Sequence, residues 1–212
     1  MKKFNLLTIV LGAFCLVFVS SATKAYADGI DVMMQFTGPT GPAVSGEYTA
    51  PYSFNVLSED GKTTLYSNIG LMCLDTQRYI SGGETWIADM ETAAAADAGS
   101  GKNLYEEAAY LAGNSGKYGT GVAQWAAWSL FNGGSAGGLD VTKALADALA
   151  NYGNYANGVV FVYEGGETGT LSAAQDFAAM TPEPNSLLLL GTGLLGFAMF
   201  LYYKRHNAVG SF

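Results

Sequence analysis

Two apolar segments, one near each end of the sequence, bound the part of the chain that can fold as a globular domain. Near the N-terminus, two lysines precede an uncharged apolar run over residues 4–19, and small residues follow up to an Ala-Tyr-Ala directly before Asp28. This layout is typical of a secretory signal peptide with cleavage before Asp28. The alternative is an uncleaved anchor, but the run is shorter than the roughly 20 residues of a spanning helix. We therefore predict a cleavable signal helix at 1–27.

The second apolar segment, residues 186–203, is long enough to cross a membrane. Its eighteen uncharged residues would form a helix of roughly 27 Å at about 1.5 Å per residue, close to the hydrocarbon thickness of a bilayer. Lys204 and Arg205 follow it directly. Basic residues after a span hold the C-terminus in the cytoplasm. The sequence thus predicts one C-terminal transmembrane helix with the body of the protein on the outer side.

The span is preceded by the short motif Pro182, Glu183 and Pro184, which completes a recognisable tail. Together with the span and its basic cluster, within 181–207, they closely resemble the PEP-CTERM sorting signal. The resemblance implies processing by signal peptidase and exosortase, export across the inner membrane, and C-terminal anchoring in the membrane through 186–203 before processing. The product would then lie on the cell surface or outside the cell, where the family is associated with extracellular polysaccharide and biofilm. An ordinary C-terminal anchor with an incidental proline pair is the alternative.

The body between these tails is acidic and lacks histidine. From Asp28 to Thr181 it has 17 acidic residues against five basic ones, a net charge of −12, and the single histidine, His206, lies beyond the apolar tail. Nucleic acid is a poor partner for such a surface, because phosphate contacts need clustered Lys and Arg. Without imidazole, a Ser-His-Asp or Cys-His relay and a His-based metal site are excluded. We expect no metal, no cofactor and no enzymatic activity.

Residues 28–180 are predicted to form one α+β domain, with antiparallel strands flanking a helical middle. Alternating apolar residues indicate a strand at 30–36, and a hairpin joins strands 47–57 and 63–74 around Asp60-Gly61. A low-complexity segment, 92–101, reads as a loop or frayed helix. Capping residues and glycine stops then predict three helices, and a last strand brings the chain back. The helices are expected at 104–112, 121–132 and 141–152, and the strand at 159–163.

Cys73 is the only cysteine that remains after signal cleavage. In an oxidising compartment cysteines usually form disulfides, so a lone one indicates either an intermolecular partner or special chemistry. The alternative is a buried, inert thiol that packs like a small apolar side chain.

The helix predicted at 121–132 carries a glutamine on an apolar face. Gln124 shares this face with Trp128 and Phe131, and the other side of the helix is apolar as well. A buried amide without partners costs about 2–7 kcal/mol. Gln124 therefore needs either hydrogen bonds or a covalent role.

The residues around these two positions resemble the motifs of thioester domains in Gram-positive surface adhesins. The matching segments are Cys-Leu-Asp at 73–75 and Gln-x-Ala-x-Trp at 124–128. In those domains a cysteine displaces ammonia from a glutamine side chain, and an amine or hydroxyl on another surface later attacks the internal thioester. The resemblance implies Cys73 as sulfur donor and Gln124 as acyl donor, with Trp128 and Trp125 as the shield.

The sequence therefore favours a non-enzymatic exported protein that attaches covalently through a Cys–Gln thioester to an amine- or hydroxyl-bearing surface or extracellular polysaccharide. Two alternatives stay open. One is a passive module that binds polysaccharide or biofilm matrix without a thioester. The other is a secreted hydrolase that uses two carboxylates, for which the acidic residues supply no distinctive pair.

Overall fold

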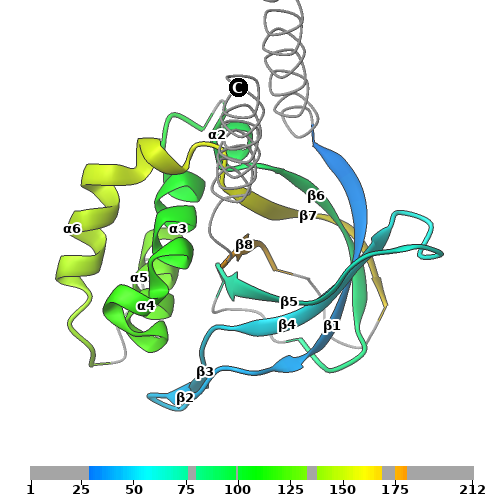
Figure 1. Cartoon of the computed structure of the whole chain (residues 1–212), viewed down its shortest axis with the longest axis horizontal. Helices are drawn as coiled ribbons and strands as arrows, with labels where there is room; N and C mark the ends of the chain where they lie inside the picture. Colours follow the sequence, from blue (N-terminus) through cyan, green and yellow to red (C-terminus); the bar gives the residue numbers. More distant parts are fainter. Residues whose placement is uncertain (1–28, 76–79, 99, 133–137, 169–174, 181–212) are drawn as a thin grey trace, which may run out of the picture. The chain divides into compact units, whose positions relative to one another are not determined.

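A computed structural model describes residues 29–75, 80–98, 100–132, 138–168 and 175–180 (Figure 1). All of them belong to the first of two compact units, Met1–Met180 and Thr181–Phe212. The predicted signal peptide at 1–27 and the predicted span at 186–203 lie outside the described residues. In the part of the chain that is described, no helix is long and apolar enough to cross a membrane.

The strands of the body close into a six-stranded antiparallel barrel in the order β1-β4-β5-β8-β7-β6. Their bounds are β1 Ile30–Pro39, β4 Tyr52–Ser58, β5 Thr64–Cys73, β6 Thr85–Thr92, β7 Val159–Thr168 and β8 Phe177–Ala179. A short hairpin of β2 (Ala43–Val44) and β3 (Glu47–Tyr48) lies between β1 and β4 in the chain. Each barrel strand pairs with two neighbours, so the barrel leaves no open edge.

Helices fill the chain between β6 and β7, as predicted for an α+β domain. They are α2 Ala93–Asp97, α3 Leu104–Gly113, α4 Ser115–Tyr118, α5 Thr120–Asn132, α6 Thr142–Asn151 and a 3-10 turn at Tyr152–Tyr155. Figure 1 shows α3 to α6 gathered on one side of the barrel, and α3 and α5 contact the strands β5, β7 and β8. The three helices and the frayed segment that the sequence predicts are therefore confirmed within one or two residues at each end.

Two apolar clusters result from the alternation of side chains along the strands. At the end of β5, Leu71 and Cys73 face the barrel interior, while Met72 and Leu74, the residue directly after the strand, pack against the helices. The interior is dominated by aromatic rings, among them Phe54, which meets Phe177 edge to face with centroids 4.6 Å apart. The last residues of β5 therefore touch both clusters at once.

The structure differs from the sequence-based expectation at three strands. β6 and the three-residue β8 were not predicted, because their side chains alternate too briefly or too mildly to stand out. The strand expected at 47–57 is interrupted between β3 and β4, where Pro51 has no N–H to donate to a ladder. This interruption has a consequence for the site, because it frees the N–H of Ala50 for a side chain.

Candidate functional site

Cys73 is the last residue of β5 and faces the interior of the barrel. It pairs across the sheet with Phe177 of β8 and is only 3% exposed. Its neighbours in the interior cluster include Phe177 and Trp128. Of the described residues it is the only cysteine, and its thiol is free.

The Cys73 thiol lies against the side-chain amide of Gln175. The sulfur is 2.7 Å from Gln175 Oε1 and 3.0 Å from the backbone carbonyl of Asp75, and the thiol can donate to either oxygen. Gln175 is 4% exposed and stands two residues before Phe177, so the pairing of β5 with β8 brings it to the end of β5. A thiol and a primary amide are thereby held together in a buried site.

Burial raises the pKa of the Cys73 thiol to about 12. The negative charges of Asp75 and Asp176 raise it further, while the hydrogen bond with the Asp75 backbone and the nearby Trp128 side chain lower it. The sulfur is therefore protonated at neutral pH. A protonated, enclosed thiol is a poor nucleophile toward reagents in solution, since the thiolate is the reactive form.

Gln124 lies at the same end of β5 but contacts the backbone of Cys73. It is fully buried, and its Nε2 donates a short hydrogen bond to the carbonyl oxygen of Cys73. Its Oε1 accepts a hydrogen bond from the N–H of Ala50 at 3.2 Å. The two ends of the amide thus join α5 to the end of β5 and to the segment between β3 and β4, which supplies the hydrogen bonds that a buried amide requires.

This geometry differs from the expected pairing of Cys73 with Gln124. A glutamine that loses its nitrogen as ammonia also loses the hydrogen bonds of that nitrogen, and Gln124 Nε2 is the group that holds the Cys73 carbonyl. By contrast, Gln175 offers its side-chain carbonyl to the sulfur itself. The amide of Gln124 thus contacts backbone groups, whereas the amide of Gln175 contacts the Cys73 sulfur.

Trp128 and Trp125, the residues expected to shield the thiol, lie on the same helix, α5. Trp128 is 4% exposed and belongs to the cluster that contains Cys73. Trp125 is half-buried and packs edge to face on Trp128, with ring centroids 4.9 Å apart and planes at 90°. Trp128 thus packs in the cluster that contains the thiol, and Trp125 packs on Trp128.

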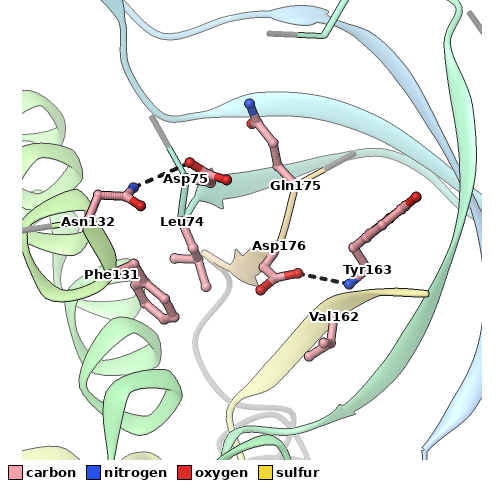
Figure 2. Close-up of a pocket in the computed structure, with 8 residues that line it drawn as sticks. All are labelled: Leu74, Asp75, Phe131, Asn132, Val162, Tyr163, Gln175 and Asp176. Atoms are coloured by element: carbon pink, nitrogen blue, oxygen red, sulfur yellow. Dashed lines mark hydrogen bonds between the residues drawn. The ribbon is translucent and has the colours of Figure 1, made fainter. Parts of the chain in front are cut away.

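A pocket of about 330 Å³ opens beside Gln175, where β5 and α5 end and the chain enters β8 (Figure 2). Figure 2 shows Asn132 reaching toward Asp75 on one side and Asp176 bonded to Tyr163 on the other. The lining residues are Leu74, Asp75, Phe131, Asn132, Val162, Tyr163, Gln175 and Asp176. The pocket reaches Gln175, whereas Cys73 is not among its walls.

Asp176 fixes the segment that carries Gln175. One carboxylate oxygen accepts from the N–H of Tyr163 at 2.8 Å, and the other accepts from the hydroxyl of Tyr105 at 2.7 Å. These bonds tie the start of β8 to β7 and α3. The residue next to Gln175 is therefore anchored from two sides, which holds the amide against the thiol.

The segment 49–51 that anchors Gln124 is packed tightly against Gly41. A Cβ at this position would lie 2.0 Å from the carbonyl oxygen of Thr49 and 2.3 Å from that of Ala50. The N–H of Gly41 also donates to the carbonyl of Pro51 at 2.9 Å. A side chain here would push the segment away and remove the Ala50 N–H from Gln124.

We therefore expect Gly41→Ala to lower the free energy of unfolding by about 1–3 kcal/mol, the usual cost of overpacking. Urea unfolding monitored by tryptophan fluorescence measures the change. Gly116→Ala is the matched control, because a Cβ at Gly116 in α4 meets nothing within 4 Å. Equal stability of the two variants would contradict a close approach at Gly41.

Other predicted features stay outside this site. Within the described ranges, no group of three or more His, Cys, Asp or Glu side chains is placed to hold a metal ion. The sorting-signal residues lie outside the described residues, so the structure gives no account of them. They are Pro182, Glu183, Pro184, Lys204 and Arg205.

Gln175 is the site residue that sequence reasoning missed. It precedes a strand of only three residues, too short to be predicted. The body has only four glutamines, at positions 35, 77, 124 and 175. Considering each of them as a partner for the single cysteine would have included Gln175. Gln175 is the one directly followed by Asp-Phe before the last apolar residues of the body.

Comparison with known proteins gives one match in the tail and one similarity to a solved structure. Residues 181–205 match the family model of the PEP-CTERM protein-sorting motif. No curated protein matches the sequence. Among solved structures, the chain is similar to the N-terminal thioester domain of a surface protein from Clostridium perfringens, with a TM-score of 0.41 and 11% sequence identity. That alignment covers 71% of this chain and 98% of the other.

Proposed function

We propose that this protein, which its PEP-CTERM motif marks for export and exosortase processing, is a non-enzymatic adhesin that attaches covalently through a thioester between Cys73 and Gln175. The observation that carries the proposal is the 2.7 Å contact between the Cys73 sulfur and Gln175 Oε1 in a buried site. The sequence assigned the acyl group to Gln124. We assign it to Gln175, because the amide of Gln124 is used in backbone hydrogen bonds.

Formation of the thioester is an exchange between the two buried side chains. The Cys73 sulfur attacks Cδ of Gln175, the carbon–sulfur bond forms, and the carbon–nitrogen bond breaks. The thiol proton leaves with the nitrogen, so the products are the thioester and one ammonia. The raised pKa of the thiol opposes attack by a free thiolate. Fixed proximity offsets this, because well-oriented groups within one molecule reach effective molarities of about 10⁵–10⁸ M.

The surroundings protect the bond and still leave access to it. Trp128 and the barrel interior exclude water from the sulfur, while the pocket reaches Gln175 from outside. An amine or hydroxyl that enters the pocket can attack the acyl carbon. The nucleophile then becomes joined to Gln175, and Cys73 is released as a thiol. Each chain reacts once, which agrees with an adhesive rather than a catalytic role.

Intact mass spectrometry of the purified full chain tests this proposal. We expect the wild-type mass to fall short of the calculated mass by one ammonia, and incubation with methylamine to add one methylamine to that species. Cys73→Ala should have its full calculated mass and should not react. Comparison of the two proteins after identical processing removes any effect of the tails. A wild-type mass without the ammonia deficit would rule out the thioester.

The pocket also contains two acidic residues that a carboxylate-based hydrolase would require. Asp75 and Asp176 both line it. However, both oxygens of Asp176 accept hydrogen bonds from Tyr163 and Tyr105. A glycosidase needs one of its two carboxyl groups as a proton donor, and the contacts of Asp176 favour an acceptor. We therefore assign Asp176 to the support of Gln175 rather than to hydrolysis.

A further inference from the structure

The indole N–H of Trp128 has no conventional partner in the described part of the protein. The side chain is 4% exposed, and its Nε1 is buried without a hydrogen bond of normal geometry. A buried polar group without a partner costs roughly 1–3 kcal/mol. Such groups in folded proteins call for an explanation, and one is a catalytic role.

The position of Trp128 on α5 directs it to the end of β5. Trp128 follows Gln124 by four residues, so the two side chains lie on one face of the helix. Gln124 on that face donates to the carbonyl of Cys73. Trp128 and Cys73 belong to the same buried cluster. Trp128 therefore packs in the same buried cluster as Cys73, on the helix face whose Gln124 meets the end of β5.

We propose that the Trp128 N–H is the hydrogen-bond donor that stabilises the Cys73 sulfur as it leaves when the thioester opens. This inference rests on the proposed thioester and adds a catalytic role to a residue otherwise regarded as a shield. When an amine attacks Cδ of Gln175, the new carbon–nitrogen bond forms and the carbon–sulfur bond breaks. The electron pair stays on sulfur, and the proton from the amine nitrogen then converts the thiolate to the thiol.

The leaving sulfur needs such a donor because its environment disfavours negative charge. The site is buried, and the carboxylates of Asp75 and Asp176 act against the thiolate. The Trp128 side chain acts in the opposite direction and lowers the pKa of Cys73. A neutral N–H is suited to the task, because it stabilises the thiolate without introducing a buried charge.

The first measurement is the rate at which methylamine opens the thioester of the full chain, followed by intact mass. Trp128→Phe keeps an aromatic ring and removes the N–H. A hydrogen bond to a charged group corresponds to a loss of about ten- to hundredfold in rate. Trp125→Phe is the matched control, because Trp125 lies on the same helix and also has a buried N–H without a hydrogen-bond partner in the described part of the chain. We expect Trp128→Phe to be slower than Trp125→Phe by that factor.

The second measurement needs no change at Trp128. The chain has three tryptophans, so a ¹⁵N-tryptophan-labelled sample gives three indole N–H resonances, assigned with Trp86→Phe and Trp125→Phe. We expect the Trp128 resonance to move when methylamine opens the thioester and to move again in Cys73→Ala, while that of Trp86 stays in place. This readout observes the indole N–H itself, with the Trp128 side chain intact.

The outcomes separate the two proposals. A normal ammonia deficit, with Trp128→Phe reacting within about twofold of Trp125→Phe, overturns the role of Trp128 and leaves the thioester intact. An indole resonance that is unchanged in Cys73→Ala overturns the same role, even if Trp128→Phe does not fold. Absence of the ammonia deficit in the wild-type chain overturns the thioester itself, and the leaving-group role falls with it.

Discussion

Gln175→Glu is expected to abolish the ammonia deficit in the intact mass completely, whereas Gln124→Glu is expected to show the same deficit as the wild-type chain. Each substitution replaces an amide by a carboxyl group of nearly the same shape, and only substitution of the true acyl donor removes the amide that releases ammonia. The sulfur of Cys73 touches Gln175 Oε1, while the amide of Gln124 bonds to the backbone of Cys73 and Ala50. The two variants should therefore differ in an all-or-none manner in intact mass and in methylamine capture.

The pH of the experiment matters for the Gln124→Glu control. A glutamic acid in this fully buried site must keep its proton to donate to the Cys73 carbonyl, and burial raises the pKa of such a group. The comparison is best made at mildly acidic pH, where the protonated form is favoured. If Gln124→Glu loses the ammonia deficit while folded and Gln175→Glu keeps it, the assignment of the two glutamines is reversed.

The second large effect is expected on stability. Gln124→Leu removes the amide that joins α5 to Ala50 and to Cys73. It leaves one buried N–H and one buried carbonyl without a partner, and each costs about 1–3 kcal/mol. We therefore expect a loss of about 2–6 kcal/mol in the free energy of unfolding, a large share of the 5–15 kcal/mol typical of a domain. Urea unfolding in a Gln175→Ala background measures it without a covalent cross-link.

Gln35→Leu in the same background is the matched control. Gln35 is half-buried, and its Oε1 accepts a single hydrogen bond from Asn55 Nδ2 at 3.0 Å. Both groups have access to water, so the loss of this bond should cost under about 1 kcal/mol. A similar small loss for Gln124→Leu would show that Gln124 is not the link between helix and strands that its contacts indicate.

Local patterns in the sequence were enough to predict the elements of the body that are long and regular. The alternation over 30–36 corresponds to β1, and the glycine stops near positions 113, 133 and 153 correspond to the ends of α3, α5 and α6 to within two residues. These signals depend on neighbours within a few residues, so a single sequence contains them. The tail was recognisable for the same reason, since its residues are contiguous, and 181–205 match the sorting motif.

The short strand β8 could not be predicted in this way. It has three residues, and it exists because Leu71, Met72 and Cys73 of β5 offer it a partner. Cross-strand pairing between Cys73 and Phe177, 104 positions apart in sequence, is not visible in local periodicity. The residue that β8 brings to the site, Gln175, was missed together with the strand.

The sequence by itself therefore determined the acidic, histidine-free composition, the lone thiol of Cys73 and the need of a buried Gln124 for partners. Only the tertiary structure decided how these needs are met. Barrel closure places Gln175 at the sulfur, while the break in the strand at Pro51 leaves the Ala50 N–H to Gln124. The physical reason is that a buried amide bonds to whichever groups the fold brings to it. Motif spacing alone cannot distinguish a backbone partner from a thiol.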